Sequence, residues 1–124
     1  MDRPENKLNT HQTFQGVRMN VVSTDPSGVV NADTIFEFTQ EGTTVSATYR
    51  GGGVEIGFLV GAYEDNRLSF RYVQREVDGK LDGGHSECDV ELADDGRLRV
   101  IEHFQWESRD KSGTNVFEQV ERCG

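Results

Sequence analysis

Residues 97–106 read Arg-Leu-Arg-Val-Ile-Glu-His-Phe-Gln-Trp, and their alternation indicates a β-strand with one apolar side. Successive side chains of a strand point to opposite faces, so the even-numbered residues of this stretch share one face. That row ends at the only tryptophan of the chain, Trp106, and holds a carboxylate, Glu102, in its middle. An unpaired buried carboxylate is too costly to keep. We therefore expect Glu102 to be functional or heavily hydrogen-bonded.

The same alternation recurs along the chain in short runs that turn-forming residues separate at intervals of roughly ten residues. Asp94-Asp95-Gly96 is a hairpin signal that leads directly into the opening stretch. No segment repeats apolar residues at the spacing of an amphipathic helix over three turns. The pattern predicts strands over residues 14–22, 34–40, 43–50, 54–63, 67–75, 85–92, 97–106 and 114–122.

The apolar row of each run predicts which side chains face the interior. In 54–63 this row contains Phe58, which places Gly57 and Gly61 on the opposite face, where a missing side chain permits a bend or a close neighbour. In 114–122 the row contains Glu118. The two expected inner rows are Ile56, Phe58 and Val60 in the first run, and Val116, Glu118 and Val120 in the second.

About eight strands joined by short loops predict an all-β, antiparallel up-and-down barrel without substantial helix. A meander of this kind has two exposed edges unless the sheet closes on itself. About eight strands is also the size at which a barrel is filled by side chains or holds one small ligand. A β-sandwich is the second choice. The expected domain covers residues 13–124, and residues 1–12, which are polar and contain Pro4, are expected to form a flexible arm.

The composition narrows the classes of function. A net charge of −9 argues against nucleic acids and anionic membranes as partners, because both require basic patches. No apolar run approaches the ~20 residues that a membrane-spanning helix needs. The two cysteines, Cys88 and Cys123, have no metal-binding or disulfide spacing. We expect a cytoplasmic protein. The charge is most simply explained by solubility, with attraction of a cationic ligand as the alternative.

Several polar and aromatic side chains are expected to point into the barrel together. Aromatic walls with a few polar anchors are the usual construction of a small-molecule site. The alternative is a wet rim where the polar groups only hydrogen-bond one another. If Glu102 and Glu118 both point inward from paired strands, they share a proton, which raises one pKa, or they face a donor such as Tyr49, Tyr72 or an arginine. The expected ligand-binding residues are Tyr49, Phe58, Tyr72, Gln74, Glu102, Phe104, Trp106 and Glu118.

Catalytic and metal-binding motifs are weak. His103 and Glu102 are adjacent and therefore face opposite ways, and the same holds for His85 and Ser86, so neither pair can act as a unit. The three histidines have no spacing typical of a metal site. Gly51-Gly52-Gly53 lacks the lysine, the hydroxyl and the following helix of a phosphate loop. We expect no catalytic residue, no metal and no cofactor.

Three motifs connect the chain to a known family: Phe36-Glu37-Phe38-Thr39-Gln40-Glu41-Gly42, Arg71-Tyr72 with Gln74, and Glu102-x-Phe104-Gln105-Trp106-x-Ser108-x-Asp110-x-Ser112. Over about residues 33–121 the chain resembles short bacterial proteins that are often labelled N-acetylglutamate synthase. The resemblance implies an avidin-like or lipocalin-like barrel. It does not support the enzyme label, because synthases of that name resemble mixed α/β acetyltransferases, whose glycine-bearing loop opens a helix. It also carries over no ligand.

We therefore expect a barrel that binds a small molecule of unknown identity. One alternative is a small cyclase or isomerase in which Glu102 acts as general acid or base, a role that needs a raised pKa. Another is a structural subunit that forms a homodimer through apolar outer faces, with Ile35, Ile101 and Phe117 lying off the inner row.

Overall fold

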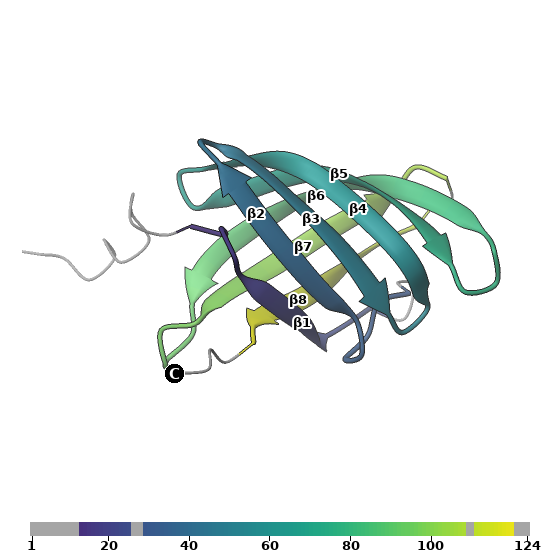
Figure 1. Ribbon diagram of the computed structural model, residues 1–124, viewed down its shortest axis with the longest axis horizontal. Helices are drawn as coiled ribbons and strands as arrows, with labels where there is room; N and C mark the ends of the chain where they lie inside the picture. Colours follow the sequence, from purple (N-terminus) through teal and green to yellow (C-terminus); the bar gives the residue numbers. More distant parts are fainter. Residues whose placement is uncertain (1–12, 26–28, 109–110, 121–124) are drawn as a thin grey trace, which may run out of the picture.

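The computed structural model describes residues 13–25, 29–108 and 111–120, and in these ranges the chain forms one β-barrel (Figure 1). The expected arm over residues 1–12 and Cys123 lie outside the described residues. The strands are β1 (Arg18–Ser23), β2 (Ile35–Glu41), β3 (Thr44–Gly51), β4 (Val54–Glu64), β5 (Arg67–Glu76), β6 (Leu81–Leu92), β7 (Leu98–Trp106) and β8 (Ser112–Gln119).

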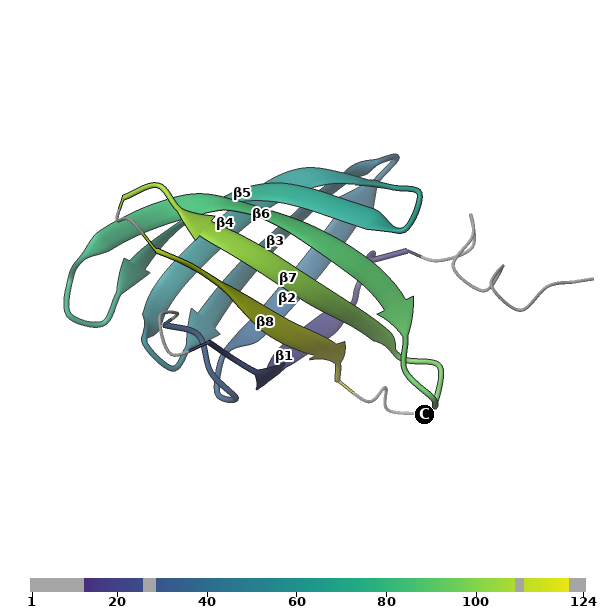
Figure 2. The same ribbon diagram turned by 180° about the vertical axis from the view of Figure 1, so that it is seen from behind.

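Each strand pairs antiparallel with the next, and β8 pairs with β1 to close the barrel. Figure 2 shows the closing side, where β8 lies between β7 and β1. In the closed barrel every strand has a neighbour on both sides. Closure thus removes the edges that an open meander would expose. The predicted up-and-down barrel of eight strands is confirmed.

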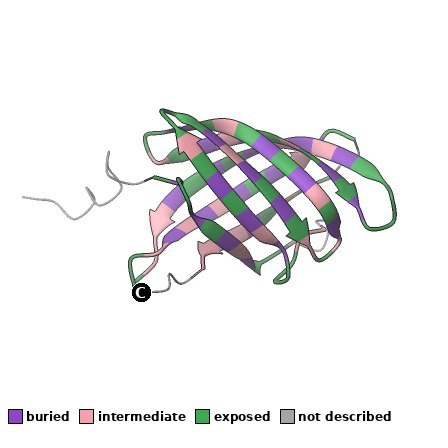
Figure 3. Ribbon diagram, in the orientation of Figure 1, coloured by how far each residue is buried: buried purple, intermediate pink, exposed green. Residues whose placement is uncertain are grey.

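Buried and exposed residues alternate along the strands, as Figure 3 shows. In β7 the even-numbered residues from Leu98 to Trp106 are buried, Glu102 included. The apolar row inferred from residues 97–106 is therefore the inner face of a strand. Cys88, directly opposite Glu102 on β6, is a buried free thiol in the core.

One end of the barrel is sealed by aromatic side chains. Phe14, just before β1, is fully buried, and its ring lies 5.0 Å from that of Tyr63 and 5.1 Å from that of Phe38. At the opposite end the inner residues Gln74, Glu102 and Asn115 are polar and line a cavity together with Val29 and Val30, which follow β1 in the chain.

The inner face of β4 is the reverse of the expected one. Gly57, Leu59, Gly61 and Tyr63 point inward, and Phe58 is 49% exposed on the outer surface. The pairing register shifts between Tyr49 and Gly51 and again between Val54 and Ile56. These irregularities change which residues of β4 face inward. Packing explains the choice, because a Cβ on Gly57 would lie 2.3 Å from Cζ of Tyr49. The glycines are the inner residues that make room for large rings opposite them.

The inner face of β8 is also reversed. Asn115 and Phe117 are buried, whereas Glu118 faces outward and lies 3.6 Å from the guanidinium of Arg99. Pairing with β7 sets this register, because Asn115 stands opposite the inward Glu102. The expected inward position of Glu118 was wrong. The expected outward position of Phe117 was also wrong, because this residue is 1% exposed. Phe117 therefore cannot belong to the proposed dimer face.

The strand β6 begins at Leu81, four residues before the predicted start at residue 85. Asp82, Gly83 and Gly84, which precede the predicted start, pair with β5. A Cβ on Gly84 would lie 2.6 Å from the Tyr72 hydroxyl oxygen. As on β4, glycine in the strand marks a close neighbour rather than a turn.

Candidate functional site

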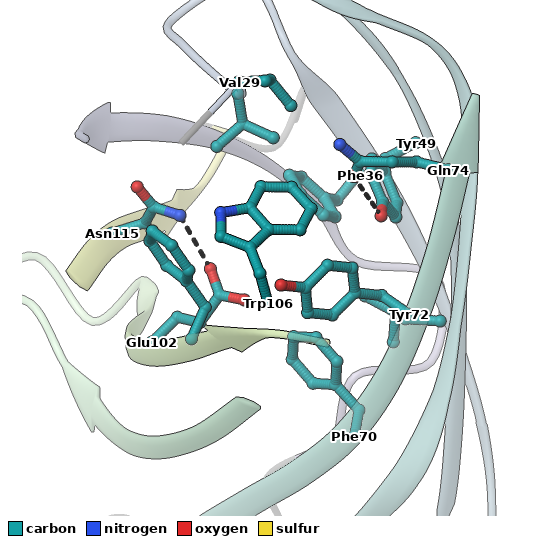
Figure 4. A pocket seen from close by; sticks show the side chains of 12 residues that line it. Val29, Phe36, Tyr49, Phe70, Tyr72, Gln74, Glu102, Trp106 and Asn115 are labelled. Carbon is teal, nitrogen blue, oxygen red and sulfur yellow. Dashed lines mark hydrogen bonds between the residues drawn. The ribbon is translucent and has the colours of Figure 1, made fainter. Parts of the chain in front are cut away.

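A small cavity lies inside the barrel at the end opposite Phe14, shown in Figure 4. Its volume is about 30 Å³, which is room for one or two water molecules. Val29 and Val30, from the segment between β1 and β2, cover it. The lining residues are Val29, Val30, Phe36, Tyr49, Leu59, Phe70, Tyr72, Gln74, Glu102, Phe104, Trp106 and Asn115.

Glu102 is the carboxylic acid of this cavity and is held by neutral donors from both neighbouring strands. Ser86 on β6 donates to Oε2 at 2.5 Å, and Asn115 on β8 donates from Nδ2 to Oε1 at 2.9 Å. Asn115 is itself fixed, because its Oδ1 accepts from Thr24 Oγ1 at 2.8 Å and from the Asp25 amide at 3.2 Å. These bonds set the orientation of the amide, so its donor end faces Glu102.

Burial raises the pKa of Glu102, and the two hydrogen bonds and the nearby His103 only partly oppose this. Burial disfavours the charged form of an acid, whereas donors to a carboxylate favour it. His103 contributes from the outer face of the same strand. Among the described residues that line the cavity there is no lysine, arginine or histidine. The two side chains described as donating to the carboxyl, Ser86 and Asn115, are both neutral.

Aromatic rings wall the cavity around Glu102. The Trp106 ring lies 5.6 Å from that of Tyr72 at 73°, and 6.0 Å from that of Phe104 at 71°. Rings at such angles form edge-to-face pairs and turn their faces in different directions. Figure 4 shows the Glu102 carboxyl, the Trp106 indole and the hydroxyl end of Tyr72 turned toward one another.

A second chain of hydrogen bonds crosses the other side of the cavity. The Tyr49 hydroxyl donates to Gln74 Oε1 at 2.8 Å, and Gln74 Nε2 donates to Glu76 Oε2 at 3.1 Å. Burial, helped by the charge of Glu102, raises the pKa of Tyr49 well above its ordinary value. Tyr49 is therefore a permanent donor near neutral pH, and this keeps the amide of Gln74 in one orientation.

Comparison with known proteins identifies the family. The family model described as avidin-like protein matches residues 12–120, which is most of the chain. The chain belongs to the avidin-like protein family. No curated protein and no solved structure matches it. The resemblance to avidin-like barrels seen in the sequence is thus confirmed, while the N-acetylglutamate synthase label stays untested.

The structure brings together most of the residues that were expected to form a site. Phe58 and Glu118 are the exceptions. Both lie on the outside of the avidin-like barrel, because the inner faces of β4 and β8 are the reverse of the expected ones. Six of the expected residues line the cavity, namely Tyr49, Tyr72, Gln74, Glu102, Phe104 and Trp106.

Sequence reasoning missed the partners of Glu102 and the cover of the cavity. Asn115 escaped notice because the strand around it was assigned the wrong face. Ser86 was considered only beside His85, which in fact lies outside, 2.8 Å from Glu107. Val29 belongs to an irregular segment with no periodicity, so nothing in the sequence signals that it reaches the cavity.

Metal-binding side chains do not cluster in the described part of the avidin-like barrel. No group of three histidine, cysteine or acidic side chains there could hold a metal ion. His103 lies on the outer face, 3.7 Å from Asp89, as expected from its position next to Glu102. The described residues also include no helix long and apolar enough to span a membrane.

The reversed face of β4 predicts opposite outcomes for two adjacent substitutions. Leu59→Ala should lower the free energy of unfolding by about 3 kcal/mol, because it removes buried methyl groups and leaves a void. Phe58→Ala should lower it by at most about 1 kcal/mol, because the ring is half exposed. Urea denaturation of both variants checks this. A larger loss for Phe58→Ala than for Leu59→Ala would restore the original assignment of the face.

Proposed function

We propose that this avidin-like protein binds a small molecule in the cavity between Glu102 and Trp106. The observation that carries the proposal is a buried carboxyl that faces a cavity walled by aromatic rings. Apolar walls with a few oriented polar groups are typical of small-molecule sites. Membership of the avidin-like family supports ligand binding in general.

The volume of the cavity limits the size of a ligand that it can hold without rearrangement. Sites for drug-sized ligands usually measure about 300–1,000 Å³, whereas this cavity measures about 30 Å³. A ligand of more than a few atoms therefore requires Val29 and Val30 to move aside. These side chains belong to a connection and not to the barrel wall. Moving them leaves all eight strand pairings intact.

Glu102 is the proposed anchor, and the remaining polar residues orient the ligand around it. The hydrogen bonds to Ser86 and Asn115 keep the carboxyl in place, so a ligand group meets a preorganised acceptor. Gln74 is held in the same way by Tyr49. Preorganised groups lose little entropy on binding, which favours affinity. Phe104 and Tyr72 complete the proposed wall.

A catalytic role for Glu102 is the second candidate. The raised pKa of Glu102 is what a general acid or base requires near neutral pH. The hydrogen bonds that Ser86 and Asn115 donate to it come from neutral side chains. Recovery of a bound molecule that is chemically unchanged would favour binding without catalysis.

The cytoplasmic location and the homodimer remain predictions.

Native mass spectrometry of freshly purified full-length protein tests the proposed function. The native mass should exceed the mass measured after denaturation by that of a discrete small molecule. Leu59→Phe, which adds bulk inside the cavity, should abolish the added mass. Val60→Phe on the same strand points outward and should retain it. Circular dichroism would verify folding, since overpacking costs about 1–3 kcal/mol.

The proposal would be contradicted by two findings together. The native protein would carry no added mass, and no small-molecule fragment would change the fluorescence of Trp106 in a saturable manner. Trp106 is the only tryptophan of the chain and lines the cavity, so its emission reports on this site alone. An added mass that persists in Leu59→Phe would place the ligand elsewhere on the protein.

A further inference from the structure

The charges around the cavity indicate which chemical class of ligand fits it. Glu102 is 5% exposed and accepts hydrogen bonds from an alcohol and an amide, both uncharged. The described lining includes no basic side chain. On the far side of the cavity, Gln74 leads to another buried acid, Glu76. The described lining of the cavity therefore contains one acid and no base.

We propose that the cavity selects a small organic cation, with an ammonium-type head group placed on Glu102 among the rings of Trp106, Tyr72 and Phe104. This inference rests on the proposed function and specifies its ligand class.

The first reason is the electrostatic cost of the carboxylate. An ionised carboxyl in a desolvated site is strongly unfavourable unless an opposite charge compensates it. The protein supplies neutral donors to Glu102 and leaves the charge itself to be balanced. A bound cation would provide that balance. An anionic ligand would instead be repelled by Glu102, and the net charge of −9 would also disfavour its approach.

The second reason is the arrangement of the rings. Aromatic faces attract cations, and several rings at steep mutual angles form the cages that recognise substituted ammonium groups. The Trp106 ring stands at 73° to Tyr72 and at 71° to Phe104. Such walls accept the apolar methyl groups of an alkylammonium ion while Glu102 accepts its charge. A neutral molecule of the same shape would gain only the contact with the rings.

The ionisation of Glu102 makes the affinity dependent on pH. A cation favours the charged carboxylate, so its affinity should rise as the pH increases through the raised pKa of Glu102 and then level off. The other titratable groups described around the cavity include Cys88 on β6, Tyr49 on β3, Tyr72 and Glu76 on β5, and the outer His103 on β7. Burial raises the pKa of Cys88 and that of Tyr49, so both stay neutral over this range.

The test uses full-length protein and follows Trp106 fluorescence during titration with two probes of nearly the same shape. These are tetramethylammonium, as its chloride, and the neutral tert-butanol, with sodium chloride keeping the ionic strength constant. We expect tetramethylammonium to bind at least about tenfold more tightly than tert-butanol, equivalent to about 1.4 kcal/mol. Glu102→Gln should remove this preference, whereas the outward Glu118→Gln should retain it. Methylammonium and methanol form a second, smaller pair for the unexpanded cavity.

Each result has a definite meaning. Equal affinities within both pairs, or an unchanged preference in Glu102→Gln, would overturn the selection of cations while leaving small-molecule binding intact. If no probe binds, the charge of the molecule found by native mass spectrometry decides whether the cavity selects cations. A cation at neutral pH would sustain the inference, and a neutral or anionic molecule would overturn it. Absence of any bound molecule would remove the proposed function as well.

Discussion

Gly57→Ala should lower the free energy of unfolding of the barrel by about 3 kcal/mol, the upper part of the usual range for overpacking. The added methyl group would lie 2.3 Å from the Tyr49 ring. That ring cannot simply move, because it stacks on Phe36 with centroids 4.5 Å apart and its hydroxyl is bonded to Gln74. Equilibrium urea denaturation, followed by circular dichroism, measures the loss.

Two controls separate this clash from a general effect of alanine in β4. Val60→Ala alters an outward residue of the same strand and should change stability by no more than about 0.5 kcal/mol. In a Tyr49→Ala background the methyl group at residue 57 has space, so Gly57→Ala should cost less than about 1 kcal/mol. A cost that stays the same without the Tyr49 ring would show that Gly57 serves another purpose.

Glu102→Ala should lower the free energy of unfolding by about 2–3 kcal/mol, because it leaves Ser86 and the donor end of Asn115 without their acceptor inside the barrel. Glu102→Gln should behave differently. Its amide oxygen can accept from Asn115 and its NH₂ group can donate to Ser86, so both buried bonds are kept. Thermal or urea unfolding of the two variants checks this contrast.

The comparison of wild type with Glu102→Gln also has a defined pH dependence. Because the pKa of Glu102 is raised in the folded state, the unfolded chain ionises first as the pH increases, and wild type loses stability over that interval. The loss begins near the ordinary glutamate pKa of about 4.3 and is complete above the raised value. Glutamine does not ionise. Glu102→Gln should therefore match wild type near pH 4 and exceed its stability at pH 8, and the reverse order would contradict a buried, destabilised carboxyl.

The barrel could be predicted from the sequence because its strands have a simple period and are joined by recognisable turns. The stretch 97–106 shows this best, since its apolar row is the buried row of β7 and its one acid is the acid of the cavity. Six expected site residues line the cavity for the same reason. They lie on regular strands whose alternation indicates the inner face correctly.

The errors came from positions where alternation does not decide the face. In β4 both rows are compatible with a strand, and the large outward Phe58 outweighed the small inward glycines in a reading based on hydrophobicity alone. The size of Tyr49, which stands opposite Gly57 on the neighbouring strand β3, explains why glycine is needed inside. In β8, the pairing of Asn115 with Glu102 sets the register. Both facts concern pairs of residues on neighbouring strands, so the pattern within a single strand cannot supply them.

A crystal structure of freshly purified full-length protein tests the central claim most directly, because it shows what occupies the space between Glu102 and Trp106. We predict density for a small molecule that contacts the Glu102 carboxyl and the Trp106 ring, with Val29 and Val30 displaced if the molecule exceeds a few atoms. Ordered water alone in this cavity, together with a copurified molecule bound elsewhere on the barrel, would contradict the claim.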